Sequence, residues 1–174
     1  MSGTIVKIAE NTVSTAVSSV TLTGMNSTYD TYMVTYRNMQ GSVNEKYPQF
    51  RFTESGTANE TNNYDYAFKK LKTYSDFAAE GGTNVNLCYL TREKLGDQTE
   101  ETANGHMYIF NASNSGEYTT ATLENSNRDA GGNLMSATGG MGFTVASAVD
   151  GIYFFIDASN IVSGEFVLYG IRKG

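Results

Sequence analysis

The sequence predicts an all-β protein built as an antiparallel β-sandwich of the sandwich or jelly-roll kind. Its 174 residues include 12 Tyr, 9 Phe and 18 Gly, and aromatic residues favour strands whereas Gly favours turns. Short runs alternate apolar and polar residues throughout the chain, and segments rich in Gly, Asn and Ser separate these runs. Eight or more short strands at this spacing are typical of a sandwich or jelly roll.

The alternating runs place the expected strands in order along the chain. Residues 1–19 are polar and weakly patterned, so we expect an N-terminal arm or a first edge strand there, and residues 20–174 form the sandwich domain. A period of two predicts strands at residues 18–24, 29–39, 48–54, 63–68, 84–90, 105–112, 118–125, 151–157 and 164–171. We expect turns between them, including 79–84, 125–133 and the Gly-rich stretch 136–143. Residues 68–79 are expected to be a turn or a strand extension.

The last two strands are apolar on both faces. In "GIYFFID", Ile152 and Phe154 face one way while Tyr153 and Phe155 face the other. A sheet with one solvated face carries polar residues at alternate positions, so we expect a second copy of the chain to cover the outer positions. The residues expected at this subunit contact are Tyr153, Phe155, Val167, Tyr169 and Ile171.

Composition excludes several classes of protein. The net charge of −6 and the scattered basic residues argue against nucleic-acid binding, and no run approaches the ~20 apolar residues of a membrane span. The single cysteine, Cys88, lies in the apolar run "VNLCYL" and is expected to be buried and inert. The N-terminus lacks a signal-peptide pattern, so we expect folding in a reducing cytosol.

The sequence contains no catalytic or metal-binding motif, and we predict neither enzymatic activity nor a cofactor. His106 is the only histidine, and no G-x-S-x-G motif is present. Asn125, Asn127 and Asp129 alternate as in half a calcium loop, but Ala130 and Ser136 stand where such a loop needs Gly and Glu. One acidic segment is interpreted as a solvated loop, with paired glycosidase carboxylates as the alternative; it contains Glu93, Asp97, Glu100 and Glu101.

A sugar-binding surface is a further alternative, because aromatic faces stack on sugars and amides bind their hydroxyls. The candidate patch is Asn62, Asn63, Tyr64 and Tyr66. Since these tyrosines alternate as in a strand, a position in the core or at a subunit interface is the favoured interpretation.

The last third of the chain resembles a known group of proteins. "GHMYIFNASNSGEYTT" followed by "VDGIYFFIDASNIVSGEFVLYGI" is similar to the C-terminal half of β-sandwich structural proteins of tailed bacteriophages, many of them marine phages. In that group a closing hairpin carries the pattern matched here by Gly151, Ile152 and the run from Ser159 to Ile171. The resemblance implies a jelly-roll-like sandwich, commonly assembled as a homotrimer and displayed on a phage head or tail.

The resemblance leads us to expect a non-enzymatic virion structural protein, assembled in the host cytoplasm and located on the exterior of the particle. Because only residues 1–19 precede the sandwich, we expect a head decoration protein that contacts the major capsid protein or other virion proteins, and itself. A tail-fibre or tail-tip module that binds host-surface glycans is the alternative, and a glycan-active enzyme is the second alternative.

Overall fold

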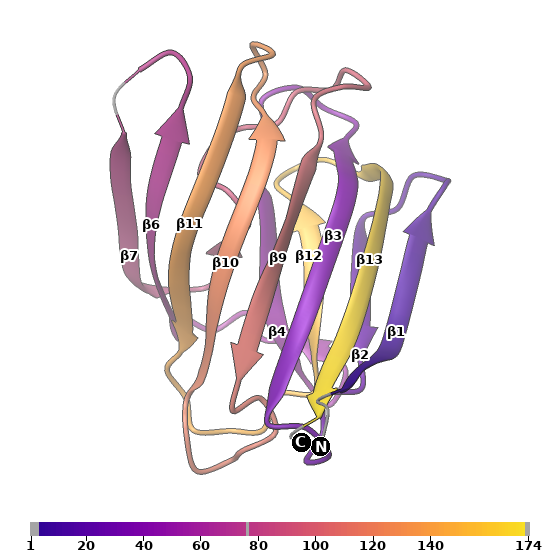
Figure 1. The fold of residues 1–174 in the computed structure, drawn as a ribbon, viewed down its shortest axis with the longest axis vertical. Helices are drawn as coiled ribbons and strands as arrows, with labels where there is room; N and C mark the ends of the chain where they lie inside the picture. Colours follow the sequence, from indigo (N-terminus) through magenta and orange to yellow (C-terminus); the bar gives the residue numbers. More distant parts are fainter. Residues whose placement is uncertain (1–3, 76, 173–174) are drawn as a thin grey trace.

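The fold consists of two antiparallel β-sheets packed face to face (Figure 1). The computed structural model describes residues 4–75 and 77–172, and these contain strands but no helix. The strands are β1 (Thr4–Val13), β2 (Ser19–Thr23), β3 (Thr31–Gly41), β4 (Pro48–Glu54), β5 (Thr57–Ala58), β6 (Tyr64–Lys72), β7 (Ala78–Val85), β8 (Cys88–Tyr89), β9 (Ala103–Phe110), β10 (Thr119–Arg128), β11 (Leu134–Phe143), β12 (Gly151–Ile156) and β13 (Ile161–Arg172). The predicted all-β sandwich is confirmed.

The order of the strands is that of a jelly roll with an extended sheet. The large sheet has the order β1-β13-β3-β9-β10-β11-β6-β7, and the small one has β2-β12-β4-β5 with β8 beside β4. The chain changes sheet at each step from β1 to β4, then between β5 and β6, between β7 and β8, between β8 and β9, and at each step from β11 to β13. With the strands beyond β9 set aside, this is jelly-roll connectivity. Strands β10, β11, β6 and β7 continue the large sheet on the far side of β9 (Figure 1).

Aromatic side chains fill the space between the sheets. Phe50, Phe52, Tyr64 and Phe143 are fully buried, and the rings of Tyr64 and Phe143 have their centroids 5.0 Å apart in a tilted arrangement. Each such ring removes a large apolar area from water, and the tilted and edge-on pairs add specific contact energy. The period-two alternation of each strand therefore has its cause in this core, since inward positions pack and outward positions meet solvent.

The two closing strands do not form the hairpin that the resemblance implies. Strand β12 lies between β2 and β4 in the small sheet, whereas β13 lies between β1 and β3 in the large one. They face each other across the core, where the rings of Phe154 and Phe166 are 5.1 Å apart. The inner positions of both strands are buried for this reason, and the C-terminal strand is held by a neighbour on each side.

Two segments expected to be turns are strands, which corrects the sequence-based prediction. Residues 79–84 lie within β7, and residues 136–143 lie within β11. The turn expected at 125–133 is shorter, since β10 continues to Arg128. Glycine is required in β11 because a Cβ added at Gly139 would overlap the carbonyl oxygen of Ala67 on the neighbouring strand β6. Glycine lets two backbones approach closely. Because it has no side chain, it also removes the apolar alternation from which strands are predicted.

Of the two alternatives for residues 1–19, the structure has an edge strand. Residues 4–13 form β1, which pairs antiparallel with β13 along its length, with one register shift between Lys7 and Ala9. Val13 at the end of β1 is buried in the core.

Candidate interaction surface

A band of apolar side chains crosses the outer face of the large sheet. The strand register aligns four neighbours in one row: Lys7, Tyr169, Met33 and Tyr108. Six partly exposed apolar residues on the outer faces of β13, β3 and β9 form what we call the outer stripe: Met33, Tyr108, Phe110, Val167, Tyr169 and Ile171. Ile5 on the edge strand β1 extends the stripe opposite Ile171 and is 58% exposed. A contiguous apolar surface of this kind is typical of a protein contact.

The five residues predicted at a subunit contact lie on two opposite faces of the molecule. Val167, Tyr169 and Ile171 belong to the outer stripe, whereas Tyr153 and Phe155 lie on the outer face of the small sheet. One flat contact with one neighbouring copy therefore cannot bury all five. The local alternation correctly separated inner from outer positions, but it held no information on which sheet each strand joins.

The aromatic residues on the small sheet are already covered in part by their own chain. The rings of Tyr153 and Phe155 contact each other with centroids 5.5 Å apart. The guanidinium carbon of Arg51 lies 4.7 Å from the Phe155 ring centroid, and Arg51 also forms an ion pair with Glu60 at 2.9 Å. This cation–π contact reduces the apolar surface that Phe155 offers to a partner.

Charged groups border the outer stripe in pairs of opposite sign. Lys7 Nζ lies 2.7 Å from Glu10 Oε2, and its hydrogen bond to Glu10 raises the pKa of Lys7. Arg37 bonds to Glu165 across β3 and β13. Beside this pair the sheet is hollowed by two adjoining depressions of about 540 Å³ and 440 Å³, which share Asn104 and the following glycine. The rim of the stripe is therefore polar, as is usual around an apolar contact.

The residues of the alternative sugar-binding patch do not form an exposed aromatic surface in the structure. Tyr64 is fully buried, where its hydroxyl accepts the Phe52 N–H and donates to the Asn59 carbonyl, each at 3.1 Å. Tyr66 is partly buried, with its ring stacked on Phe68 at a centroid distance of 5.3 Å. Both tyrosines point to the inner side of β6 because alternate positions of a strand share one face. Their neighbours Asn62 and Asn63 therefore have no exposed aromatic platform beside them.

The interior beneath β6 and β7 holds a network of ion pairs. Lys70 is 6% exposed and contacts both Glu80 and Glu93, while Lys72 Nζ lies 2.7 Å from Glu93 Oε1. Arg92 Nε bonds to Glu80 Oε2 at 2.6 Å. Burial opposes the charge of Lys70, but its bonds to Glu80 and Glu93 outweigh this, so the pKa of Lys70 is raised.

This network separates the four acidic residues that the sequence groups together. Glu93 pairs with the two lysines, and the buried Glu101 accepts the Gln98 N–H at 3.1 Å. Asp97 and Glu100 are exposed. The segment is therefore in part structural, because the carboxylates of Glu93 and Glu101 are bound within the fold.

The residues resembling half a calcium loop also have separate roles. Asp129 accepts the N–H groups of Gly131 and Asn133, each at 2.9 Å, and closes the β10–β11 turn. Asn125 and Asn127 point into the core, where Asn125 interacts with the buried Tyr36 hydroxyl, while the Asn127 amide has no hydrogen-bond partner among the described residues. Within residues 4–75 and 77–172, no three His, Cys, Asp or Glu side chains are grouped so that they could hold a metal ion.

The remaining reactive side chains do not form a catalytic arrangement. Cys88 is fully buried, as predicted, and burial raises the pKa of its thiol, which keeps it protonated and unreactive. His106 lies on the outer face of β9 with its Nε2 4.0 Å from the Glu124 carboxylate. In the part of the chain that the structure describes, no helix is long and apolar enough to cross a membrane.

The chain matches no family model, no curated protein and no solved structure. We therefore infer its function from the fold, the outer stripe and the resemblance of its last third.

Proposed function

We propose that the chain is a non-enzymatic structural protein of a tailed-bacteriophage virion that self-associates on the outside of the particle, as a homotrimer. The observation that carries the proposal is the outer stripe on a jelly-roll sandwich. A stripe that crosses β13, β3 and β9 and is bordered by paired charges has the composition of a subunit contact. The resemblance of the closing strands to phage sandwich proteins supplies the biological setting.

The proposed mechanism is mechanical. The stripe joins copies of the chain, and the loops at the two ends of the sandwich contact the major capsid protein or other virion proteins. Because several copies bind together, individually weak contacts with the particle become strong in combination. A head decoration protein acts in this way by bridging neighbouring capsid subunits.

Attachment to host-surface glycans from a tail fibre or tail tip is a second candidate. The observation that favours it is the pair of adjoining polar depressions on the large sheet, lined in part by Asn104, His106 and Glu124. These side chains provide amide, imidazole and carboxylate groups for sugar hydroxyls. Binding to a glycan array that is lost in His106→Ala would support this candidate over head decoration.

A reconstruction of the phage particle tests the location. Density for the sandwich repeated over the capsid lattice is expected for a decoration protein. Density at the tail alone would favour the second candidate, and absence from the purified particle would refute both.

Self-association is tested separately by light scattering on the purified chain. Because the stripe is proposed to join three chains of 18.9 kDa, we expect a mass that is a multiple of three chains, and we expect Tyr169→Lys to lower it threefold because a charge would enter the stripe. Thr138→Lys, on the exposed outer face of β11, is the matched control and should leave the trimer intact. A monomeric wild-type chain would refute the trimer.

A further inference from the structure

Strand β7 is an open edge of the large sheet. It pairs with β6 on one side, and among the described residues no strand pairs with its other side. Proteins usually protect such edges with Lys, Pro or strong bulges because the free N–H and C=O groups would otherwise accept another strand. The sequence of β7, AAEGGTNV, has neither Lys nor Pro.

Neither an unpaired charge nor a register shift protects the first half of β7 from pairing with another strand. Its only charged residue, Glu80, points inward and is bound by Lys70 and Arg92. The register of the β6–β7 pair shifts only near the end of β7, between the positions paired with Tyr64 and Tyr66. The regular segment 78–82 therefore presents a continuous backbone edge whose one inward charge is neutralised by Lys70 and Arg92.

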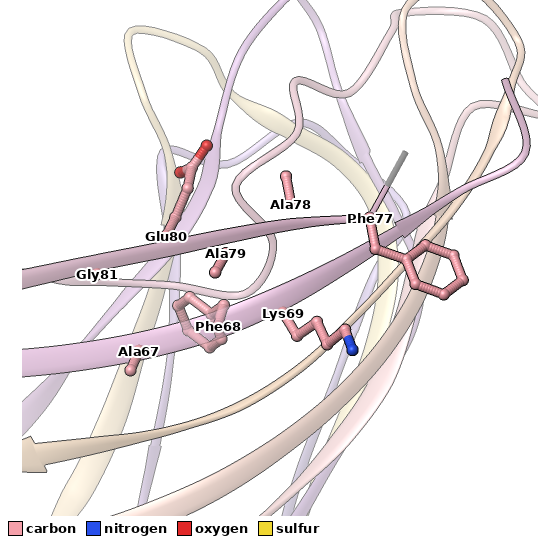
Figure 2. A pocket seen from close by; sticks show the side chains of 8 residues that line it. All are labelled: Ala67, Phe68, Lys69, Phe77, Ala78, Ala79, Glu80 and Gly81. Atoms are coloured by element: carbon pink, nitrogen blue, oxygen red, sulfur yellow. The ribbon is translucent and has the colours of Figure 1, made fainter. Parts of the chain in front are cut away.

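An exposed aromatic ring stands at the start of this edge, beside a hollow. Phe77 is 64% exposed, the highest value among the large hydrophobic residues that the structure describes. The adjacent hollow of about 650 Å³ is lined in part by Ala67, Ala79 and Gly81. In Figure 2 the Phe77 and Lys69 side chains extend in a similar direction, with Lys69 Nζ 5.5 Å from the ring centroid.

We propose that two copies of the chain join through β7, pairing antiparallel about a twofold axis at Ala79, so that their large sheets become continuous. In this register Ala79 faces Ala79 of the second copy, and Phe77 faces its Gly81. Directly opposed side chains on one face of an antiparallel pair are in contact, so each exposed ring covers the glycine and the hollow of the other copy. Aromatic residues stabilise opposed glycines in sheets in this manner.

Other registers of the same two strands fit less well. Centring the pair on Glu80 would place two carboxylates directly opposite each other, which is unfavourable. Centring it on Gly81 would move Phe77 away from the glycine and leave both rings exposed. In the Ala79 register, Glu80 lies opposite Ala78 of the second copy, and the contact is self-complementary as a twofold interface must be.

This contact is distinct from the outer stripe and does not rest on the virion assignment. Strands β10, β11 and β6 separate β7 from β9, the last strand of the stripe. A change on β7 is therefore expected to alter one self-contact and leave the other intact.

Opposite charges at position 79 test the twofold axis. Ala79 is exposed on β7, so Ala79→Glu and Ala79→Lys each place two like charges across the axis without burying them. Sedimentation velocity over a dilution series should show β7-dependent association weakened at least about tenfold in each variant, which corresponds to about 1.4 kcal/mol. An equimolar mixture should restore it, because Glu then faces Lys.

Matched variants on the opposite edge give the control. Thr12 is exposed on the edge strand β1, so Thr12→Glu and Thr12→Lys should leave the β7-dependent association unchanged. Unweakened association of the two Ala79 variants would overturn the proposal. Weakening without rescue in the mixture would also overturn it, since position 79 would then face some other surface.

A cross-link provides a second measurement. Opposed residues of an antiparallel pair have Cα atoms about 4.5 to 5.5 Å apart, within the range that a disulfide spans. Ala79→Cys should therefore form a covalent dimer under mild oxidation, whereas Thr12→Cys should not, and the native Cys88 is buried. A wild-type chain without any association and an Ala79→Cys variant without a covalent dimer would each refute the β7 contact, whatever the location of the protein in a particle.

Discussion

Lys70 and Glu93 form an ion pair in the interior of the sandwich, with 2.8 Å between Lys70 Nζ and Glu93 Oε1. Lys70 also bonds to Glu80, which in turn binds Arg92. The Arg92 guanidinium carbon lies 4.2 Å from the ring centroid of Tyr89. The end of β6 at Lys70 therefore covers charged groups, whereas its start at Tyr64 packs in the aromatic core.

Removing Lys70 should destabilise the fold. Lys70→Ala leaves the carboxylates of Glu80 and Glu93 with less positive charge beside them in a poorly solvated site. We expect the free energy of unfolding to fall by about 2 kcal/mol. This is less than for a fully buried pair because Glu80 is partly exposed. Urea unfolding measures the change. Lys94→Ala, which breaks the exposed pair with Glu45, should have little effect, and equal losses in the two variants would contradict the expected difference.

The same network should make stability depend on acid. Burial raises the pKa of Glu80, but bonds from Lys70 and Arg92 outweigh it, so the pKa lies below its ordinary value of 4.5. A lowered carboxyl pKa stabilises the fold above the unfolded value, and this contribution is lost as the pH falls through the folded value. In thermal unfolding, Glu80→Gln should have a lower Tm than wild type. This difference in Tm should be largest near neutral pH and should close below about pH 4. A gap independent of pH would contradict this.

Replacing Asn127 by an apolar residue of similar shape should stabilise the protein. Its amide is 2% exposed and has no hydrogen-bond partner among the described residues, and burying such a group is unfavourable. Asn127→Leu should raise the free energy of unfolding by about 1 kcal/mol. Asn104→Leu is the contrast, because Asn104 Oδ1 accepts the Asn38 N–H at 2.9 Å and its loss should lower stability. A loss in both variants would show that Asn127 is satisfied.

Two glycines of β11 should respond differently to alanine. A Cβ at Gly139 would overlap the Ala67 carbonyl oxygen, whereas a Cβ at Gly142 would meet only the Thr120 methyl group, at 3.9 Å. Gly139→Ala should lower the free energy of unfolding by about 2 kcal/mol or more through overpacking, and Gly142→Ala should be close to neutral. Chemical unfolding of both variants checks this, and similar stabilities would contradict the close approach of β11 to β6.

Strand prediction succeeded for most runs in which side chains carried the alternation, but the predicted strand 84–90 is divided between the end of β7 in the large sheet and β8 in the small one. The run 151–157 was assigned correctly because Ile152 and Phe154 are bulky and apolar on one face, which is a local property. Strands β7 and β11 were missed because Gly81 and Gly139 have no side chain to mark a face, so the signal was absent although the backbone forms ladders there.

The candidate site was predicted only in part for a related reason. Val167, Tyr169 and Ile171 lie on the outer stripe as expected for outward positions, but Tyr153 and Phe155 lie on the other sheet. Met33 and Tyr108 could have been found by the same alternation, since each lies between buried neighbours of its strand. Whether Met33 and Tyr108 lie beside Tyr169 depends on the order of the strands in the sheet, which the local alternation does not encode.

By itself, the sequence determined the class of fold, the inner and outer positions of most strands and the burial of Cys88, because each of these follows from the period of apolar residues along a short segment. Tertiary structure alone decided that β12 and β13 face each other across the core, that Tyr64 is enclosed and that Lys70 meets Glu93 in the interior. Those outcomes depend on which strands become neighbours, and neighbours here come from distant parts of the chain. Only their packing together sets which polar groups are paired and which apolar surface is left for a partner.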